Sequence, residues 1–205
     1  MKKTLVTMMI TLTSLSLHAQ LIRFGVKAGL NFSKETQNAV VAQYISTDLS
    51  FRTGWHLGGI MNVVLSDRLE LETDLMYSMQ GYKDIVLTEA VEQNLSRTNY
   101  TVTSHYLTLP VALKFYPVGN LYVAAGPQFG YLLSKRDKLE GWESLNYYTS
   151  DKNRNFDFGI LGGIGYRFND NFFIDLRYIH GFTGTSKVVN GSKNRNIQVS
   201  LGYLF

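Results

Sequence analysis

The sequence predicts an all-β fold: an eight-stranded antiparallel up-and-down transmembrane β-barrel with short periplasmic turns and long extracellular loops. Eight segments alternate apolar with polar or small residues at a period of two, the pattern of strands with two different faces. Short turns and long loops join these segments alternately, which is typical of outer-membrane barrels. Aromatic residues also gather near the ends of the segments, as they do at membrane interfaces.

The composition excludes several other classes of protein. The 205 residues are 45% hydrophobic and only 18% charged, with 18 Gly, 13 Tyr and 12 Phe. This balance is too apolar and aromatic for a disordered chain and too weakly charged for a nucleic-acid-binding module. Because the chain has no cysteine, disulfide frameworks, thiol catalysis and cysteine-based zinc sites are also excluded.

Residues 1–19 have the layout of a secretory signal peptide. Lys2 and Lys3 form a positive start, an apolar stretch with Thr and Ser follows, and the small residue Ala19 precedes the expected cleavage site. The apolar stretch is short for a membrane-spanning helix. We therefore expect a signal peptide over 1–19 and a barrel domain over 20–205, exported to the Gram-negative outer membrane.

The first four predicted strands place a large apolar side chain at every second position. Their ranges are Arg23–Phe32, Thr53–Leu65, Leu69–Gln80 and His105–Tyr116. Their apolar faces begin with Phe24, Trp55, Leu69 and Leu107, respectively. The intervening positions hold glycine, polar or charged residues, including three carboxylates on one face of the third strand. This two-sided pattern justifies each of the four strands.

The last four predicted strands follow the same rule. Their ranges are Leu121–Leu133, Phe156–Phe168, Ile174–Tyr178 and Asn196–Phe205. Two prolines fall within otherwise well-patterned strands, Pro110 in the fourth and Pro127 in the fifth. Since proline cannot donate a hydrogen bond to a neighbouring strand, each one predicts a bulge or a local break.

The connections indicate which end of the barrel faces the periplasm. Loops of about 20 residues follow the first, third and fifth strands, and one of about 11 follows the seventh, as expected for extracellular loops. The other connections are the short turns Ser66–Arg68, Pro117–Asn120 and Asn169–Asn171. With an even number of strands, both chain ends lie on the side of the short turns, which we assign to the periplasm.

Periodicity alone does not show whether the apolar face meets lipid or a soluble core. The aromatic residues favour lipid, because they form two predicted interfacial girdles. The girdle near the short turns comprises Phe115, Tyr116, Tyr122, Tyr166, Phe168, Phe172, Phe173, Tyr203 and Phe205. The girdle toward the loops comprises Trp55, Tyr77, Tyr82, Tyr106, Tyr131, Tyr178 and Phe182. The alternative is a soluble periplasmic barrel of lipocalin type that binds an apolar ligand inside.

If lipid lies outside, the charged residues of the strands point into the lumen. They are Lys27, Glu70, Glu72, Asp74, Lys114, Asp157, Arg167, Asp175 and Arg177. Buried charges are tolerated when they are paired and hydrogen-bonded. We therefore expect a charge network that fills the lower lumen and blocks free diffusion. An alternative hypothesis is that the same network lines a narrow pore.

Three segments resemble the outer-membrane β-barrel domain common in Bacteroidetes, often labelled PorT-like. They read LELETDLMYSMQGYK, HYLTLPVALKFYPVGNLYVAAGPQFGYLL and NIQVSLGYLF. The resemblance covers essentially the whole chain after residue 19, and it implies an eight-stranded barrel related to the OmpA and OmpX type. It also implies insertion by the outer-membrane assembly machinery, which recognises a last strand ending in aromatic residues, here Tyr203 and Phe205. It implies no reaction, and no motif carries over a role in secretion or gliding.

A search for catalytic chemistry finds no complete arrangement. His56 is expected in the lumen opposite Ser78, and His105 and His180 on the lipid side, none with an evident partner for a Ser-His-acid triad. No phosphate loop or dinucleotide fingerprint is present. We therefore predict no catalysis, no cofactor and no metal, with a lipid-modifying barrel enzyme as the remaining alternative.

The predicted function is a structural or interaction role through the extracellular loops. The loop after the fifth strand contains Trp142, Tyr147 and Tyr148 among charges, a composition suited to contact with lipopolysaccharide, a partner protein or a glycan. We expect a monomer whose partners are outer-membrane lipid, the assembly machinery during insertion and an envelope partner at the loops. No nucleic acid is expected to bind.

Overall fold

The computed structural model describes residues 22–36, 50–90, 94–139, 155–184 and 193–205. The predicted signal peptide and the loop aromatics Trp142, Tyr147 and Tyr148 lie outside these residues. Within the described residues, no helix is long and apolar enough to cross a membrane.

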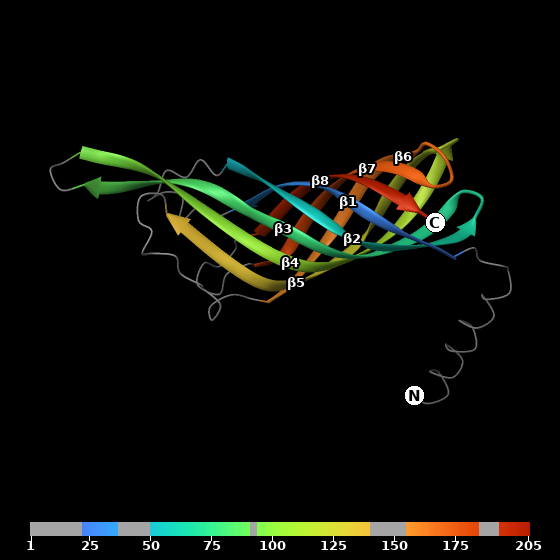
Figure 1. Ribbon diagram of the computed structural model, residues 1–205, viewed down its shortest axis with the longest axis horizontal. Helices are drawn as coiled ribbons and strands as arrows, with labels where there is room; N and C mark the ends of the chain where they lie inside the picture. Colours follow the sequence, from blue (N-terminus) through green and yellow to red (C-terminus); the bar gives the residue numbers. More distant parts are fainter. Residues whose placement is uncertain (1–21, 37–49, 91–93, 140–154, 185–192) are drawn as a thin grey trace, which may run out of the picture.

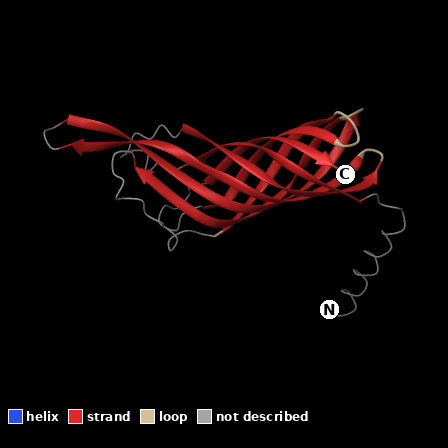
Figure 2. Ribbon diagram, in the orientation of Figure 1, coloured by secondary structure: helices blue, strands red, loops and turns tan. Residues whose placement is uncertain are grey.

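The described residues form eight strands that close into one barrel (Figures 1 and 2). The strands are β1 (Ile22–Thr36), β2 (Ser50–Ser66), β3 (Leu69–Ala90), β4 (Asn94–Val118), β5 (Leu121–Leu139), β6 (Phe156–Arg167), β7 (Phe172–Gly184) and β8 (Lys193–Leu204). Each strand pairs antiparallel with its neighbours in sequence, and β1 closes the barrel on β8. The predicted fold class is confirmed.

Closure of the barrel satisfies the edges that β1 and β8 would otherwise expose. The two strands pair from Gly25 opposite Leu204 to Thr36 opposite Lys193. The amide of Phe205 also donates to the carbonyl of Phe24 at 2.8 Å. Unpaired peptide groups are costly in lipid, so a spanning sheet must close on itself in this way.

The polarity of the two faces of the sheet is the reverse of that in a soluble barrel. Large apolar side chains point outward and are exposed, for example Phe24 at 60% and Leu75 at 54%. Polar and charged side chains point inward and are buried, with Asn62 and Lys114 both at 0%. This arrangement fits lipid outside and a polar interior, and it contradicts the lipocalin-like alternative.

Strands β3 and β4 extend well beyond the ends expected from the sequence. Their pairing continues to Ala90 opposite Asn94, so they form a hairpin that projects past the rest of the barrel at the end away from the C-terminus (Figure 1). The sequence predicted strand ends at Gln80 and His105. Beyond these points the sequence no longer alternates regularly, as in the consecutive apolar residues Ile85, Val86 and Leu87, so the pattern does not indicate the extension.

The predicted bulge or break at each proline is present as a local break in the pairing without a register shift: the β3–β4 pairing skips Pro110 and the β4–β5 pairing skips Pro127. Pro110 pairs with Gln128 and Leu113 with Ala125 in one unchanged register, and Pro127 lies opposite Ile160 without a shift. The register shifts between β4 and β5 fall elsewhere, at His105/Tyr106 and at Phe115/Val118. The neighbouring residues of both strands hold the register, so the loss of one donor at each proline is tolerated.

Large rings in the lumen lie against glycines on neighbouring strands. Gly202 on β8 faces the Phe173 ring of β7, and Gly165 on β6 faces the Tyr122 ring of β5. A Cβ atom added at either glycine would overlap the ring. Both rings are buried, so the narrow interior is filled by pairing large side chains with glycine.

Substituting Gly202 by valine should therefore destabilise the barrel. The new side chain would displace the Phe173 ring, and overpacking of this kind costs about 1–3 kcal/mol. The measurement is the free energy of unfolding by urea in detergent micelles. Gly162→Val is the matched control, because Gly162 faces outward and an added Cβ meets no atom within 4 Å. Equal stability of the two variants would contradict this packing argument.

Candidate functional site

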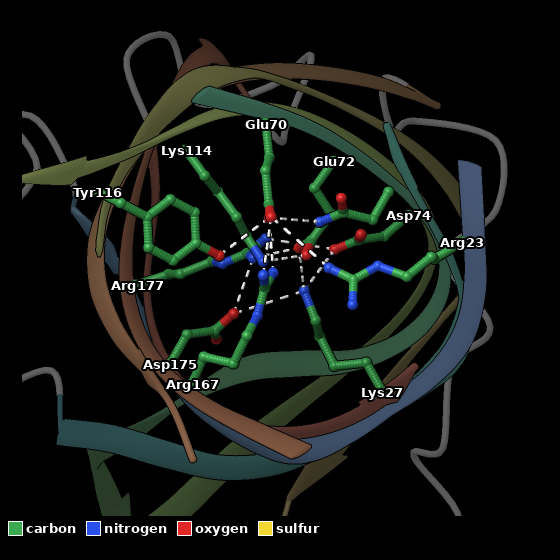
Figure 3. A network of polar contacts seen from close by, with 11 residues as sticks. Arg23, Lys27, Glu70, Glu72, Asp74, Lys114, Tyr116, Arg167, Asp175 and Arg177 are labelled. Carbon is green, nitrogen blue, oxygen red and sulfur yellow. Dashed lines mark hydrogen bonds and ion pairs between the residues drawn. The ribbon is translucent and has the colours of Figure 1, made fainter. Parts of the chain in front are cut away.

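The periplasmic half of the lumen contains a network of buried ion pairs centred on Glu72 (Figure 3). The Glu72 carboxylate accepts from Lys27 Nζ at 2.5 Å, from Arg177 Nη2 at 2.5 Å and from Lys114 Nζ. These partners come from β1, β7 and β4, respectively, while Glu72 lies on β3. One carboxylate thus connects four strands across the lumen.

Two further carboxylates complete the charge balance around this centre. Asp74 lies 2.9 Å from Lys27 Nζ and 3.2 Å from Arg177 Nη1. Asp175 lies 2.7 Å from Arg177 Nη2 and 3.5 Å from Lys27 Nζ. The side chains of all these groups are at most 3% exposed, so each charge is compensated by its neighbours rather than by solvent.

A second cluster lies nearer the periplasmic turns and is centred on Glu70. Arg167 donates to both Glu70 oxygens, at 2.7 and 2.6 Å. Tyr116 Oη donates at 2.9 Å and Asn62 Nδ2 at 3.0 Å, while Arg23 Nη2 lies 3.6 Å away. The bidentate pair fixes the planar guanidinium against the carboxylate.

Sequence reasoning missed several members of these clusters. The sequence places Arg23 on the same polar face as Lys27 but does not include it among the lumen charges, and five aromatic residues assigned to the interfacial girdles are buried inside the barrel. These are Tyr82, Tyr106, Tyr116, Tyr122 and Phe173. Their position in the two-residue alternation is the inward one, a signal that could have separated them from the outward aromatics.

The inward rings contribute to the network through their faces. Lys114 Nζ lies 4.5 Å from the centre of the Tyr122 ring and 4.4 Å from that of Phe173. The Arg167 guanidinium lies 5.0 Å from the centre of the Tyr116 ring. Such cation–π contacts stabilise a cation that has been removed from water.

Asp157, which the sequence also assigned to the lumen network, lies apart from it. The residue is near the extracellular end of β6, opposite Gly130 on β5. Its carboxylate accepts a hydrogen bond from Thr183 Oγ1. The other eight predicted residues lie together in the two clusters around Glu72 and Glu70.

A layer of neutral polar residues lies above the charges and includes His56. The sequence found no evident partner for this histidine, but Nδ1 lies 2.8 Å from Asn31 Oδ1 and Nε2 lies 3.0 Å from Ser200 Oγ. Because an amide oxygen only accepts, Nδ1 donates to Asn31 and Nε2 accepts from Ser200. The two partners lie on β1 and β8, whereas the sequence indicates only that His56 lies opposite Ser78 on β3.

The order Ser200, His56, Asn31 has the form of a nucleophile, a base and an orienting group. All three side chains are buried, at 1%, 3% and 0%, and Asn31 Oδ1 also accepts from Gln198 Nε2 at 3.1 Å. A substrate atom must reach both the nucleophile and an oxyanion donor, and this burial keeps substrate from the Ser200 hydroxyl. The layer acts as a hydrogen-bonded part of the barrel interior.

The predicted assembly signal lies on the outer surface of the closing strand. The Tyr203 ring packs against Phe172 with ring centres 4.7 Å apart and against Phe205 at 5.6 Å. Phe205 is 71% exposed. Both aromatics therefore lie at the periplasmic rim.

Replacing Glu72 by glutamine should strongly destabilise the barrel. The substitution leaves Lys114 and its neighbouring cations buried without their shared carboxylate, and breaking a buried pair costs about 3–5 kcal/mol. The measurement is urea unfolding in detergent micelles. Asp170→Asn, on an exposed periplasmic turn, should leave the unfolding free energy unchanged. Glu72→Gln combined with Lys114→Met should recover part of the loss, and no recovery would contradict the pairing argument.

Comparison with known proteins agrees with the fold. Residues 18–187 match the family described as "Outer membrane protein beta-barrel domain". The crystal structure of Neisserial surface protein A has a TM-score of 0.55 and 14% identity, and covers 89% of this chain and 97% of that one. Ail of Yersinia pestis gives a TM-score of 0.46 and 12% identity, with 89% and 98% covered.

The outer membrane protein OprG of Pseudomonas aeruginosa has a TM-score of 0.45 and 15% identity, with 90% of this chain and 94% of that one covered. Among curated proteins, no sequence matches this chain. The family match spans most of the chain, and the likeness to Neisserial surface protein A shows the same fold. The protein therefore belongs to the outer membrane protein β-barrel domain family and is a small outer-membrane barrel.

Proposed function

We propose that this protein is a non-conducting outer-membrane barrel with a structural or interaction role at the cell surface and no catalytic activity. The observation that carries the proposal is the network around Glu72, whose side chains reach across the lumen from four strands (Figure 3). A path for ions or solutes would have to run through these paired charges.

The energetics of the network support a closed lumen. Opening a path means separating buried partners such as Glu72 and Lys114, and removing one partner of such a pair costs about 3–5 kcal/mol. The rings of Tyr122 and Phe173 occupy space beside the same charges. In addition, the interior of an eight-stranded barrel is just wide enough to be filled by side chains.

The extracellular side supports the interaction role. The paired hairpin of β3 and β4 extends to Ala90 and Asn94, well past the length that a tilted strand needs to cross a membrane. We propose that this hairpin and the loop carrying Trp142, Tyr147 and Tyr148 contact a protein or glycan of the cell envelope. A rigid hairpin is a suitable support for such contacts because it lowers the entropy cost of binding.

Two further parts of the proposal concern biogenesis. The protein is exported by the signal peptide at 1–19, and the assembly machinery recognises Tyr203 and Phe205 on the last strand. The outward position of both aromatics at the rim, with Phe205 71% exposed, supports this role, since a recognition signal has to be accessible. We propose that the folded barrel is a monomer.

The closed lumen predicts that the protein adds no channel conductance. Purified barrel inserted into a planar lipid bilayer should give no discrete current steps in potassium chloride. Insertion is checked independently by the electrophoretic shift between unheated and boiled samples, because a closed membrane barrel stays compact until heated. Reproducible current steps from barrels that pass this check would overturn the proposal of a closed lumen.

The interaction role predicts that the projecting hairpin can be removed without loss of the barrel. Replacing residues 86–98 by a two-residue turn should preserve the heat-dependent electrophoretic shift, since the ion pairs around Glu72 and Glu70 are all made by residues outside this segment. Cross-linking on intact cells should then lose adducts that the unmodified protein forms. Unchanged adducts in the shortened variant would contradict a role for the hairpin.

A further inference from the structure

Basic side chains on the outer surface of the barrel gather at its extracellular end. We call this set the outer basic belt. It comprises Lys34, Lys83, Arg136, Lys138, Lys193 and Arg195. All six are partly or fully exposed. They alternate with inward residues, so they share the face of the sheet that carries the lipid-facing side chains.

The strand register places these residues in two groups, one on β8 and β1 and the other on β3 and β5. Arg195 on β8 pairs with Lys34 on β1, and Lys193 pairs with Thr36 on β1. Farther around the barrel, Lys83 on β3 and Lys138 on β5 both lie opposite Thr101 of β4. Arg136 lies opposite the neighbouring outward residue of β4, Thr103. The belt therefore spans β8, β1 and β3 to β5.

The belt lies level with the outermost of the outward aromatics: Phe51 packs against Lys34, and Phe182 lies two residues beyond His180, which faces Arg195. Tyr178 lies opposite Ile197, and the next outward pair along the same strands is His180 with Arg195. This step corresponds to about 7 Å along the strand. On the other side, Tyr131 precedes Arg136 on β5. Aromatic rings mark the level where lipid headgroups begin, so the belt lies at the height of headgroup phosphates.

The charge of the outer surface differs sharply between the two ends. Among the described side chains of the strands, the outward face carries no carboxylate; the acids Glu70, Glu72, Asp74, Asp157 and Asp175 all belong to inward positions. At the periplasmic end the outward positions are apolar, as at Phe24, Leu121 and Leu201. Among the described side chains, the outer basic belt thus carries positive charges without carboxylates, and it adjoins the apolar band that faces lipid.

We propose that the outer basic belt binds the phosphate groups of lipids in the outer leaflet, preferring phosphomonoester headgroups over zwitterionic ones. A lipid whose chains lie on the apolar band would place its phosphate against the belt, where lysine and arginine donate charge-assisted hydrogen bonds. Lipid-anchored phosphate fits better than a free anion because the belt faces the membrane and not a pocket. The proposal rests on the outer-membrane location, not on the closed lumen.

Trp55 provides a local reporter for this contact. It is 44% exposed on the outer face of β2, and Lys34 Nζ lies 4.8 Å from the centre of the ring of Phe51 on the same strand. The only other tryptophan in the chain is Trp142. Trp55 lies opposite Leu30, four residues along β1 from Lys34, or roughly 13 Å, so a Trp142→Phe background leaves fluorescence that reports the acyl chains of a lipid whose headgroup lies at Lys34 and Arg195.

The experiment measures quenching of Trp55 in vesicles that contain brominated phosphatidic acid or brominated phosphatidylcholine. The Trp142→Phe protein should bind phosphatidic acid at this site roughly fivefold more tightly than phosphatidylcholine. This ratio of binding constants is the one expected for a lysine or arginine near a phosphate surface. Lys34→Gln with Arg195→Gln should reduce the preference to about onefold, since both local cations are then removed.

Arg136→Gln with Lys138→Gln is the matched control. It removes the same charge from β5, away from the reporter, and should keep the preference at Trp55. The heat-dependent electrophoretic shift shows for each variant that the barrel is folded and inserted. The proposal is overturned if the background protein shows no preference or if the Lys34 and Arg195 variant retains it. Loss of the preference in millimolar inorganic phosphate at constant ionic strength would instead indicate a free-anion site and overturn the lipid assignment.

Discussion

The pairing of charges across the lumen is the constraint on which the rest of the barrel depends. Glu72 on β3 has its partners on β1, β4 and β7, so its full set of partners is assembled only when the sheet has closed. A shift of one residue in the register of β1, β3, β4, β6 or β7 would turn a charge toward lipid and a large apolar side chain into the lumen. The ion pairs and the membrane thus select the same register, one from inside and the other from outside.

Closure also determines how the interior is filled. The bulk of Tyr122 and Phe173 is accommodated because glycines lie beside their rings, and both rings lie over Lys114. The polar layer above the charges also depends on closure, because both ring nitrogens of His56 form hydrogen bonds with residues of β1 and β8. In a lumen this narrow, hydrogen bonding and packing are achieved by the same side chains.

The sequence predicted the strand number, the inward and outward faces and most charged lumen residues, because these depend on a two-residue period that is visible locally. It did not predict which charges meet. The contact of Arg167 with Glu70 joins residues 97 positions apart and requires the full register of the barrel. The partners of His56 were missed for the same reason. The extension of β3 and β4 was missed because its sequence does not alternate regularly, as in the consecutive apolar residues Ile85, Val86 and Leu87.

The charges of this protein are held in two different ways, inside and outside the barrel. Inside, cations and carboxylates compensate one another within a few ångströms, so the interior has little capacity left to bind an external ion. Outside, the described cations near the extracellular interface share a face with no described carboxylate of the strands. A charge already paired in a buried network gains little from a new ligand, whereas an exposed cation beside lipid gains a hydrogen-bonded anion. The surface of the barrel, and not its lumen, is therefore where binding energy remains available.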